Sequence, residues 1–288
     1  MIFLAAQMFA ASLPRQDANS VLRRRRELPR VLPQLFDPER RCMSASNQNW
    51  PSLRSVGLDG VLVSFGGSLS EPANRAALAF RAAVDRAGFA GVVETAPSLV
   101  SCYVRYEPLE VDPQELRTQL QGLMDGRDWY AAPLPQGRRL WRIPTVYGGA
   151  LAPQLAEAAG LAGMSEIDAI TALSSARVRV QTIGFAPGMP YLGALPQAWD
   201  IPRQTDLTPN VPAGGLCVAI RQLVLFPVAT QTGWRQVGQT AIRLFDPTSD
   251  TPFVLRPGDE VQFPAIDLDT LDTLRDDPLG GAISEELP

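Results

Sequence analysis

The first half of the chain alternates short apolar segments with segments of helical spacing. Residues 60–65 read as a strand, and a helix is predicted from Glu71, because Ser70 can cap its start and Gly88 can end it. A second helix is predicted to begin at Asp112, which precedes a proline. Further strands are predicted at residues 91–96, 101–106 and 139–143. This order predicts a ferredoxin-like fold for residues 53–143, with both helices on one face of a sheet.

The second half begins with helical spacing and then changes to short apolar or alternating segments between glycine and proline turns. Helices are predicted at residues 153–161 and 165–174, the latter capped by Ser165. Strands are predicted at residues 178–183, 217–220, 223–227, 240–245 and 261–263. Many short strands with such turns are typical of a closed barrel or a sandwich. The fold class is therefore predicted to be α+β, with an all-β second domain over residues 144–266.

The two ends of the chain differ from this pattern. Residues 1–12 are apolar but are too short to span a bilayer and lack a preceding basic region, so a secretory signal is the weaker reading. Residues 13–42 hold four consecutive arginines and scattered prolines. We interpret residues 1–42 as a disordered extension or a wrongly assigned start, with Met43 as the true start; a basic targeting arm is the alternative. Residues 267–288 are predicted to be an acidic, solvated C-terminal tail.

Composition excludes several mechanisms. The chain has no histidine, and all 26 of its basic side chains are arginines, so it cannot supply a Ser-His-Asp or Cys-His nucleophile, a Schiff-base lysine or a phosphate-loop lysine. Its three cysteines, Cys42, Cys102 and Cys217, are far apart, which indicates no metal site and a reducing, cytoplasmic compartment, although carboxylates could hold magnesium. The net charge of −4 argues against nucleic acid as a partner.

Glycine, proline and aromatic residues gather at regular places between residues 179 and 240. Glycine permits close approach of a ligand to the backbone, proline fixes loops, and tyrosine or tryptophan offers a flat wall with one donor. This segment predicts a rigid binding cleft.

The motifs of this segment resemble those of a known family, that of the 5-oxoprolinase B subunits, also described as allophanate hydrolase subunit 1 and as the sporulation kinase inhibitor family. The resemblance covers about residues 53–265. The longest matching motifs are Gly-Phe-Ala-Pro-Gly-Met-Pro-Tyr-Leu-Gly at 184–193, Val-Pro-Ala-Gly at 211–214, Gly-Trp at 233–234, Gly-Gln-Thr at 238–240 and Arg-Pro-Gly-Asp at 256–259. The chain is thus identified as a divergent member, carrying a carboxyltransferase subdomain C.

The resemblance implies a cyclophilin-like barrel behind the ferredoxin-like domain. It also implies a partner, the C subunit, with a related barrel, and a separate A subunit. Together these subunits would use ATP, with Mg²⁺, to open 5-oxoproline to glutamate, the nucleotide being bound by the complex rather than by this chain alone. Neither nucleic acid nor a membrane is expected as a partner.

Three residues are predicted to carry the chemistry: Arg179, Arg203 and Gln222. A guanidinium can bind a carboxylate or phosphate through two parallel hydrogen bonds, and both arginines lie beside the proline and glycine loops. The alternative is a surface or intersubunit ion pair. The Gln222 amide could pair with the substrate ring, or it could be a buried amide that pairs with backbone.

Five further residues are predicted to bind substrate: Tyr191, Pro212, Gly214, Trp234 and Thr240. Each has a structural alternative: the aromatic residues as ordinary core, Gly214 as a turn former and Thr240 as a plain strand residue. Asp246 and Asp259 could contribute carboxylates, or could serve turns.

Two departures from the family pattern leave the activity open. Leu173 stands where the family usually has a histidine, and residues 220–224 lack glycines and a threonine that the family usually carries. Ile220 and Val224 are therefore expected to cover backbone that a glycine loop would leave open. Three hypotheses follow: a component of a 5-oxoprolinase, a component of a urea or allophanate enzyme, and a binding protein without catalysis.

Overall fold

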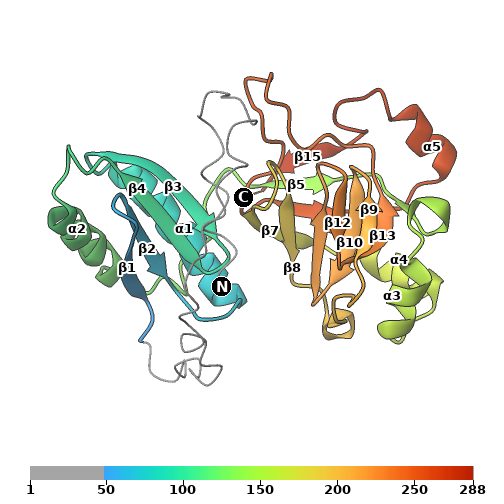
Figure 1. Cartoon of the computed structure of the whole chain (residues 1–288), viewed down its shortest axis with the longest axis horizontal. Coiled ribbons are helices and arrows are strands. Elements are labelled where there is room, and N and C mark those ends of the chain that lie inside the picture. The colour runs from blue at the N-terminus through green and yellow to red at the C-terminus, as the bar shows by residue number, and fades with distance from the viewer. Residues whose placement is uncertain (1–48, 288) are drawn as a thin grey trace, which may run out of the picture. The chain divides into compact units, whose positions relative to one another are not determined.

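The computed structural model describes residues 49–287, and the expectations for residues 1–42 and Met43 lie outside them. The described part contains a small antiparallel sheet with two helices and a larger curled sheet (Figure 1). The α+β class predicted from the sequence is confirmed.

The small sheet has the strand order β1-β2-β4-β3, and all its neighbours are antiparallel. Its elements are β1 (Ser52–Val56), β2 (Gly60–Ser64), α1 (Glu71–Ala87), β3 (Val92–Ser98), β4 (Ser101–Tyr106) and α2 (Pro113–Asp125). Alternate residues of β2 and β4, such as Val61 and Val104, are buried against Phe80 of α1 and Leu120 of α2. Both helices therefore cover one face of this sheet, as period-2 patterning requires.

The predicted helix signals are confirmed. The Ser70 hydroxyl accepts a hydrogen bond from the Ala73 amide, and Gly88 ends α1 in the left-handed conformation. The Asp112 carboxylate accepts a hydrogen bond from the Gln114 amide at the start of α2. In the second half, α3 (Leu155–Leu161) and the Ser165-capped α4 (Glu166–Ser175) also lie at the predicted places.

The fourth strand of the ferredoxin-like order was assigned wrongly. The predicted strand at 139–143 forms β5 (Arg139–Arg142), but it belongs to the larger sheet, where it runs parallel to β14 (Glu260–Gln262). The position beside β2 is taken by β1, a strand that the sequence pattern did not reveal. The half-polar sequence of β1 shows weak apolar alternation, because its last three residues are exposed.

The larger sheet has nine strands in the order β15-β5-β14-β7-β8-β11-β10-β13-β6, and a separate pair joins β9 and β12. The remaining bounds are β6 (Val146–Tyr147), β7 (Val178–Ile183), β8 (Pro190–Gly193), β9 (Thr208–Val211), β10 (Gly215–Ala219), β11 (Gln222–Leu225), β12 (Thr230–Thr232), β13 (Arg235–Gln239) and β15 (Ile283–Glu286), with 3₁₀ turns η1 (Gly149–Leu151) and η2 (Gln197–Trp199). The predicted strand at 240–245 is wrong, since this segment contains only an isolated bridge from Phe245 to Phe253.

At β10 both faces of this sheet are buried. On β10, Leu216 and Val218 point into the main core, which also packs against α3 and α4, whereas Cys217 and Ala219 join a second core. This second core includes Trp234 and lies on the opposite face, as the alternation of side chains along a strand requires. The strand β10 is therefore buried and without polar side chains along its whole length, which explains why its sequence reads as a continuous apolar run.

The C-terminal segment is more than a solvated tail. It contains α5 (Leu268–Thr273), whose Leu271 is fully buried, and β15, which pairs antiparallel with β5. Backbone pairing does not depend on apolar side chains, so the exposed sequence of β15 gave no strand signal.

The turn between β10 and β11 carries backbone strain. It is a two-residue hairpin in which Ile220 and Arg221 both have positive φ, at 44° and 61°. Such turns favour Asn-Gly, and a β-branched residue in this conformation is a genuine outlier. The turn is held by backbone hydrogen bonds from Ile220 to Ile201 and from Arg221 to Trp199.

Replacing this pair by Ile220→Asn/Arg221→Gly is expected to raise the free energy of unfolding by about 1–2 kcal/mol, because the left-handed conformation costs side-chain-bearing residues roughly that much. Denaturant unfolding measures the change. The matched control, Ile220→Val/Arg221→Lys, keeps the steric penalty and should bring no gain. An Asn-Gly variant no more stable than the parent would contradict strain at this turn.

Candidate functional site

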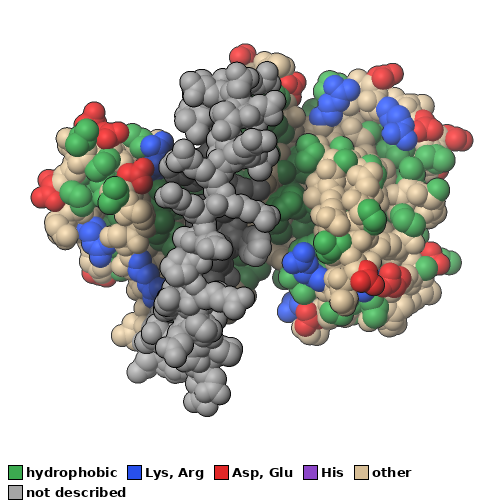
Figure 2. All heavy atoms as spheres, viewed as in Figure 1, with side chains coloured by type: hydrophobic (Ala, Val, Ile, Leu, Met, Phe, Trp, Pro, Cys, Tyr) green, Lys and Arg blue, Asp and Glu red, His purple; other side chains and the backbone are tan. Residues whose placement is uncertain are grey.

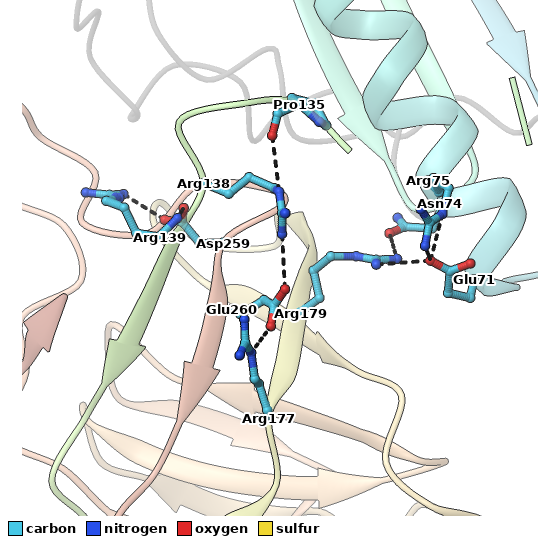
Figure 3. A network of polar contacts seen from close by, with 10 residues as sticks. All are labelled: Glu71, Asn74, Arg75, Pro135, Arg138, Arg139, Arg177, Arg179, Asp259 and Glu260. Atoms are coloured by element: carbon cyan, nitrogen blue, oxygen red, sulfur yellow. Dashed lines mark hydrogen bonds and ion pairs between the residues drawn. The ribbon is translucent and has the colours of Figure 1, made fainter. Parts of the chain in front are cut away.

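Arg179 lies on β7 and reaches α1 of the small sheet (Figure 3). Its Nη2 donates to the Asn74 side-chain oxygen at 3.0 Å, and its Nη1 lies 3.2 Å from the Glu71 carboxylate. Its Nε is buried without a hydrogen-bond partner among the described residues. The guanidinium is thus engaged in an ion pair within the chain, which favours the structural alternative over direct contact with a substrate carboxylate.

Glu71 is shared between two arginines. Burial raises its pKa, but the Arg75 and Arg179 guanidinium groups that donate to its carboxylate outweigh that effect and hold the pKa below its ordinary value. A carboxyl group whose pKa is lowered on folding stabilises the protein above its unfolded pKa, and this stabilisation is lost as the pH falls through the folded pKa.

The Glu71→Gln variant is accordingly expected to lose less stability than the parent when the pH is lowered from about 5 towards 3, since it has no carboxylate to protonate. Thermal unfolding across this pH range measures the difference. Glu285, an exposed partner of Arg142, offers the control Glu285→Gln. Parallel pH profiles for parent and Glu71→Gln would show that the Glu71 ion pair contributes nothing.

Gln222 forms a buried amide pair. Its Nε2 donates to the Gln181 side-chain oxygen at 2.7 Å, and both residues are almost fully buried. The backbone of Gly193 lies between them in the sheet, where a Cβ would come within 3.1 Å of three Gln181 atoms. Gln222 therefore pairs with another side chain, whereas the sequence suggested backbone as the alternative to a ligand.

Tyr191 and Trp234 come together at the edge of the second core. Their rings make an edge-on contact with centroids 6.3 Å apart, and Trp234 is 7% exposed. Burial raises the pKa of the Tyr191 hydroxyl, and the positive charge of Arg203 opposes this shift. The Arg203 Nε lies 3.6 Å from the place that a Cβ on Gly233 would take, and Gly233 directly precedes Trp234. Arg203 is itself exposed. These three residues form an aromatic wall with a cation beside it.

Gly214 and Thr240 are also in contact, and this contact is part of the packing of the fold. Gly214 has a φ of +78°, and a Cβ there would collide with the Thr240 carbonyl oxygen and lie 2.7 Å from Gln239. The Thr240 hydroxyl and amide both donate to the Gly214 carbonyl oxygen. Pro212 lies exposed at the end of this turn. Close backbone packing therefore accounts for Gly214 and Thr240.

Of the eight predicted site residues, Tyr191 and Trp234 form the aromatic wall and Arg203 is the cation beside it. Arg179 and Gln222 share one row of the sheet, since both are register partners of Gly193. Their side chains nevertheless have different partners, Asn74 with Glu71 and Gln181, respectively.

The sequence interpretation missed two buried residues that make several polar contacts, Asn74 and Arg235. Asn74 is fully buried and donates to the Leu99 and Gln181 carbonyl oxygens as well as accepting from Arg179. Arg235, 6% exposed, is paired with Glu157 at 2.8 Å. The one available signal for Asn74 was a polar residue on the apolar face of its helix.

Asp259 has a structural role. Its carboxylate accepts hydrogen bonds from the Arg139 and Arg256 amides, the Arg139 guanidinium and the Trp141 indole. Asp246 is a turn residue, because the amide and hydroxyl of Thr248, two residues further on, donate hydrogen bonds to its carboxylate. These hydrogen bonds also lower the pKa of this exposed carboxyl group.

The residues that depart from the family pattern lie in three different environments. Leu173, at the usual histidine position, is fully buried in the main core, and Val224 is fully buried in the second core. Ile220 is 46% exposed at the hairpin turn.

Comparison with known proteins assigns this chain to a family. Residues 51–255 match the family model of the carboxyltransferase domain, subdomain C and D. The chain belongs to the carboxyltransferase domain family. One relative of this carboxyltransferase-family chain is the B subunit of 5-oxoprolinase from Bacillus subtilis, 30% identical over 73% of the chain and 91% of the relative. Another is the 5-oxoprolinase B subunit of Escherichia coli O157:H7, 44% identical over 43% of the chain and 57% of the relative.

Solved structures share the fold. The crystal structure of TTHA0988 matches 75% of the carboxyltransferase-family chain at 33% identity with a TM-score of 0.60, and the match spans 40% of that protein. The Kluyveromyces lactis urea amidolyase matches 82% of the chain at 17% identity with a TM-score of 0.63, over 16% of its own length. The second likeness shows the fold alone.

Neither a metal cluster nor a membrane helix is found within residues 49–287. No group of three or more Cys, Asp or Glu side chains there is placed to hold a metal ion. No helix in that part of the chain is long and apolar enough to cross a bilayer.

Proposed function

We propose that this chain is the B subunit of a 5-oxoprolinase, which acts with the A and C subunits to open 5-oxo-L-proline to L-glutamate using ATP. The observation that carries this proposal is the match to the Bacillus subtilis 5-oxoprolinase B subunit over 91% of that protein. Overall, 5-oxoproline, ATP and two waters give glutamate, ADP and phosphate. The lactam C–N bond and the terminal P–O bond of ATP break, and water supplies the added carboxylate oxygen and two of the three ammonium protons.

Within this proposal the aromatic wall is the substrate-facing surface. Arg203 is exposed and its Nε lies beside Gly233, the residue before Trp234, so its guanidinium can bind the substrate carboxylate through two hydrogen bonds. Tyr191 and Trp234 offer flat faces for a five-membered ring. Arg179 and Gln222 act indirectly, by fixing β7, β8 and β11 behind this wall.

The described residues do not fit a Mg²⁺-nucleotide site, since they offer neither a carboxylate cluster nor a lysine. We therefore propose that ATP and its Mg²⁺ bind at the complex rather than to this chain alone, with the other subunits supplying the Mg²⁺ ligands. Cys102 and Cys217 are free and buried, in keeping with assembly in the reducing cytoplasm.

The test is ATP hydrolysis by the full chain co-expressed with the A and C subunits, with and without 5-oxo-L-proline. Arg203→Ala is expected to lower kcat/KM about ten- to hundredfold, as loss of a charge-assisted contact does, whereas Arg243→Ala, at another exposed arginine, should not. Turnover that depends on urea or allophanate, in place of 5-oxoproline, would assign the chain to the other enzyme class.

A second candidate function is a binding subunit without catalysis. Burial of Leu173 in the main core favours it, because the chain has no side chain there that could move a proton. A stable complex with the A and C subunits that shows no substrate-dependent ATP hydrolysis would replace the first proposal with this one.

A further inference from the structure

A groove of about 160 Å³ lies between α1, the segment that leads into β5 and the loop that leads into β14. Its charged lining consists of Arg81 and Asp85 from α1, Arg138, Arg256 and Asp259. None of these residues belongs to the aromatic wall. Arg138 is held between the Pro135 carbonyl oxygen and the Glu260 carboxylate, as Figure 3 shows.

The groove has an excess of positive charge. Counting the lining and its direct ion-pair partners, the groove has four arginines and three carboxylates: Arg81, Arg138, Arg139 and Arg256 with Asp85, Asp259 and Glu260. The chain as a whole carries −4, and on the visible face basic and acidic side chains are interspersed (Figure 2). The groove therefore has a local excess of one positive charge on a chain that is negative overall.

The carboxylates that line the groove are already satisfied. Asp259 receives four hydrogen bonds, and Asp85 accepts from Thr95 and lies 3.4 Å from the Arg81 Nε. The Arg256 side chain, by contrast, is exposed and has no ion pair or hydrogen bond within the described part of the chain. Its guanidinium is available to a ligand.

The walls of the groove are fixed in advance. The loop at residues 256–259 is closed by two hydrogen bonds, from the Arg256 amide to the Asp259 carboxylate and from the Asp259 amide to the Arg256 carbonyl oxygen. The Gly258 amide ties the same loop to Val180 of β7. The backbone that carries Arg256 is therefore ordered before an anion binds, so the conformational entropy lost on binding is mainly that of the Arg256 side chain.

We propose that this groove binds a phosphate-type anion, either free phosphate or the terminal phosphoryl group of a nucleotide. Arginine pairs with phosphate through two parallel hydrogen bonds, and three arginines line the groove, of which Arg256 has no side-chain partner among the described residues. The volume admits a small anion and a few waters, since each water occupies about 30 Å³. It is below the roughly 300–1,000 Å³ of pockets that enclose drug-sized ligands, so a whole nucleotide does not fit.

The experiment titrates inorganic phosphate into the full chain alone by calorimetry, at constant ionic strength with chloride as the balancing anion. Arg256→Gln is expected to weaken phosphate binding at least about tenfold, as loss of a charged hydrogen bond does. The matched control is Arg275→Gln, which removes an exposed arginine that follows α5. Each variant loses one arginine and keeps all the others, so the difference in phosphate affinity between the two variants reports the contribution of the groove.

Undetectable binding of phosphate to the parent, or equal weakening in both variants, would overturn the proposal. If Arg256→Gln proves unfolded, Arg81→Gln takes its place, with the same expected loss. Competition by ATP would identify a nucleotide phosphoryl group as the ligand, and binding of phosphate without such competition would identify free phosphate. Because the titration contains neither the A nor the C subunit, its result is independent of the 5-oxoprolinase test.

Discussion

Replacing Asp259 by alanine is expected to lower the free energy of unfolding by about 3–5 kcal/mol, the range found when one partner of a buried ion pair is removed. The Asp259 side chain is 2% exposed and lies 2.7 Å from the Arg139 guanidinium. Its removal also leaves the Arg139 and Arg256 amides and the Trp141 indole without their acceptor. For a protein of this size the melting temperature should fall by roughly 6–20 °C.

Thermal and denaturant unfolding measure this effect, and Asp272→Ala is the matched control, because Asp272 forms an exposed pair with Arg275. That control should change stability by less than about 1 kcal/mol. The double variant Arg139→Met/Asp259→Ala should be less destabilised than the sum of the two single variants, since it leaves no unpaired charge. Additive single effects would mean that Asp259 acts through its backbone contacts and not through the Arg139 ion pair.

Local signals in the sequence predicted the helices well. Ser70, Gly88, Asp112 and Ser165 are caps that act within one turn of chain, so their effect does not depend on the rest of the fold. The strands β4 and β7 were also predicted with their observed bounds, because buried apolar residues mark them.

Strand partners were less predictable. The segment that forms β5 reads correctly as a strand, but nothing within it specifies that it pairs with β14, more than a hundred residues away. The strands β1 and β15 were missed because they are held by backbone hydrogen bonds and expose most of their side chains. Pairing in a sheet is a property of two segments, and periodicity describes only one.

The candidate site shows the same limit. Tyr191 and Trp234 were singled out as flat aromatic residues, and the structure brings them together. The roles of Arg179 and Gln222 depend on Glu71, Asn74 and Gln181, whose positions follow from how β7 packs against α1 and β8. A guanidinium or amide can serve a ligand or a neighbour equally well, and only the neighbours decide.

Replacement of Asn74 is expected to have the second large effect on stability. Asn74→Ala is expected to lower the free energy of unfolding by about 2–4 kcal/mol, because it strips a hydrogen bond from the buried Gln181 carbonyl oxygen, one from the Leu99 carbonyl oxygen and one from the Arg179 guanidinium. These bonds join α1 to β7, so hydrogen exchange of the β7 amides should accelerate with the loss of stability. Asn210→Ala, at an exposed position, should stay within about 0.5 kcal/mol of the parent.

Asn74→Leu separates the two physical causes of this effect. Leucine restores apolar bulk at this position but cannot donate to the Gln181 and Leu99 carbonyl oxygens or accept from Arg179. If unpaired polar groups dominate, Asn74→Leu will be destabilised as much as Asn74→Ala. Recovery of parental stability in Asn74→Leu would show that packing, and not the hydrogen bonds of Asn74, holds β7 against α1. The Arg179 ion pair would then rest on Glu71 alone.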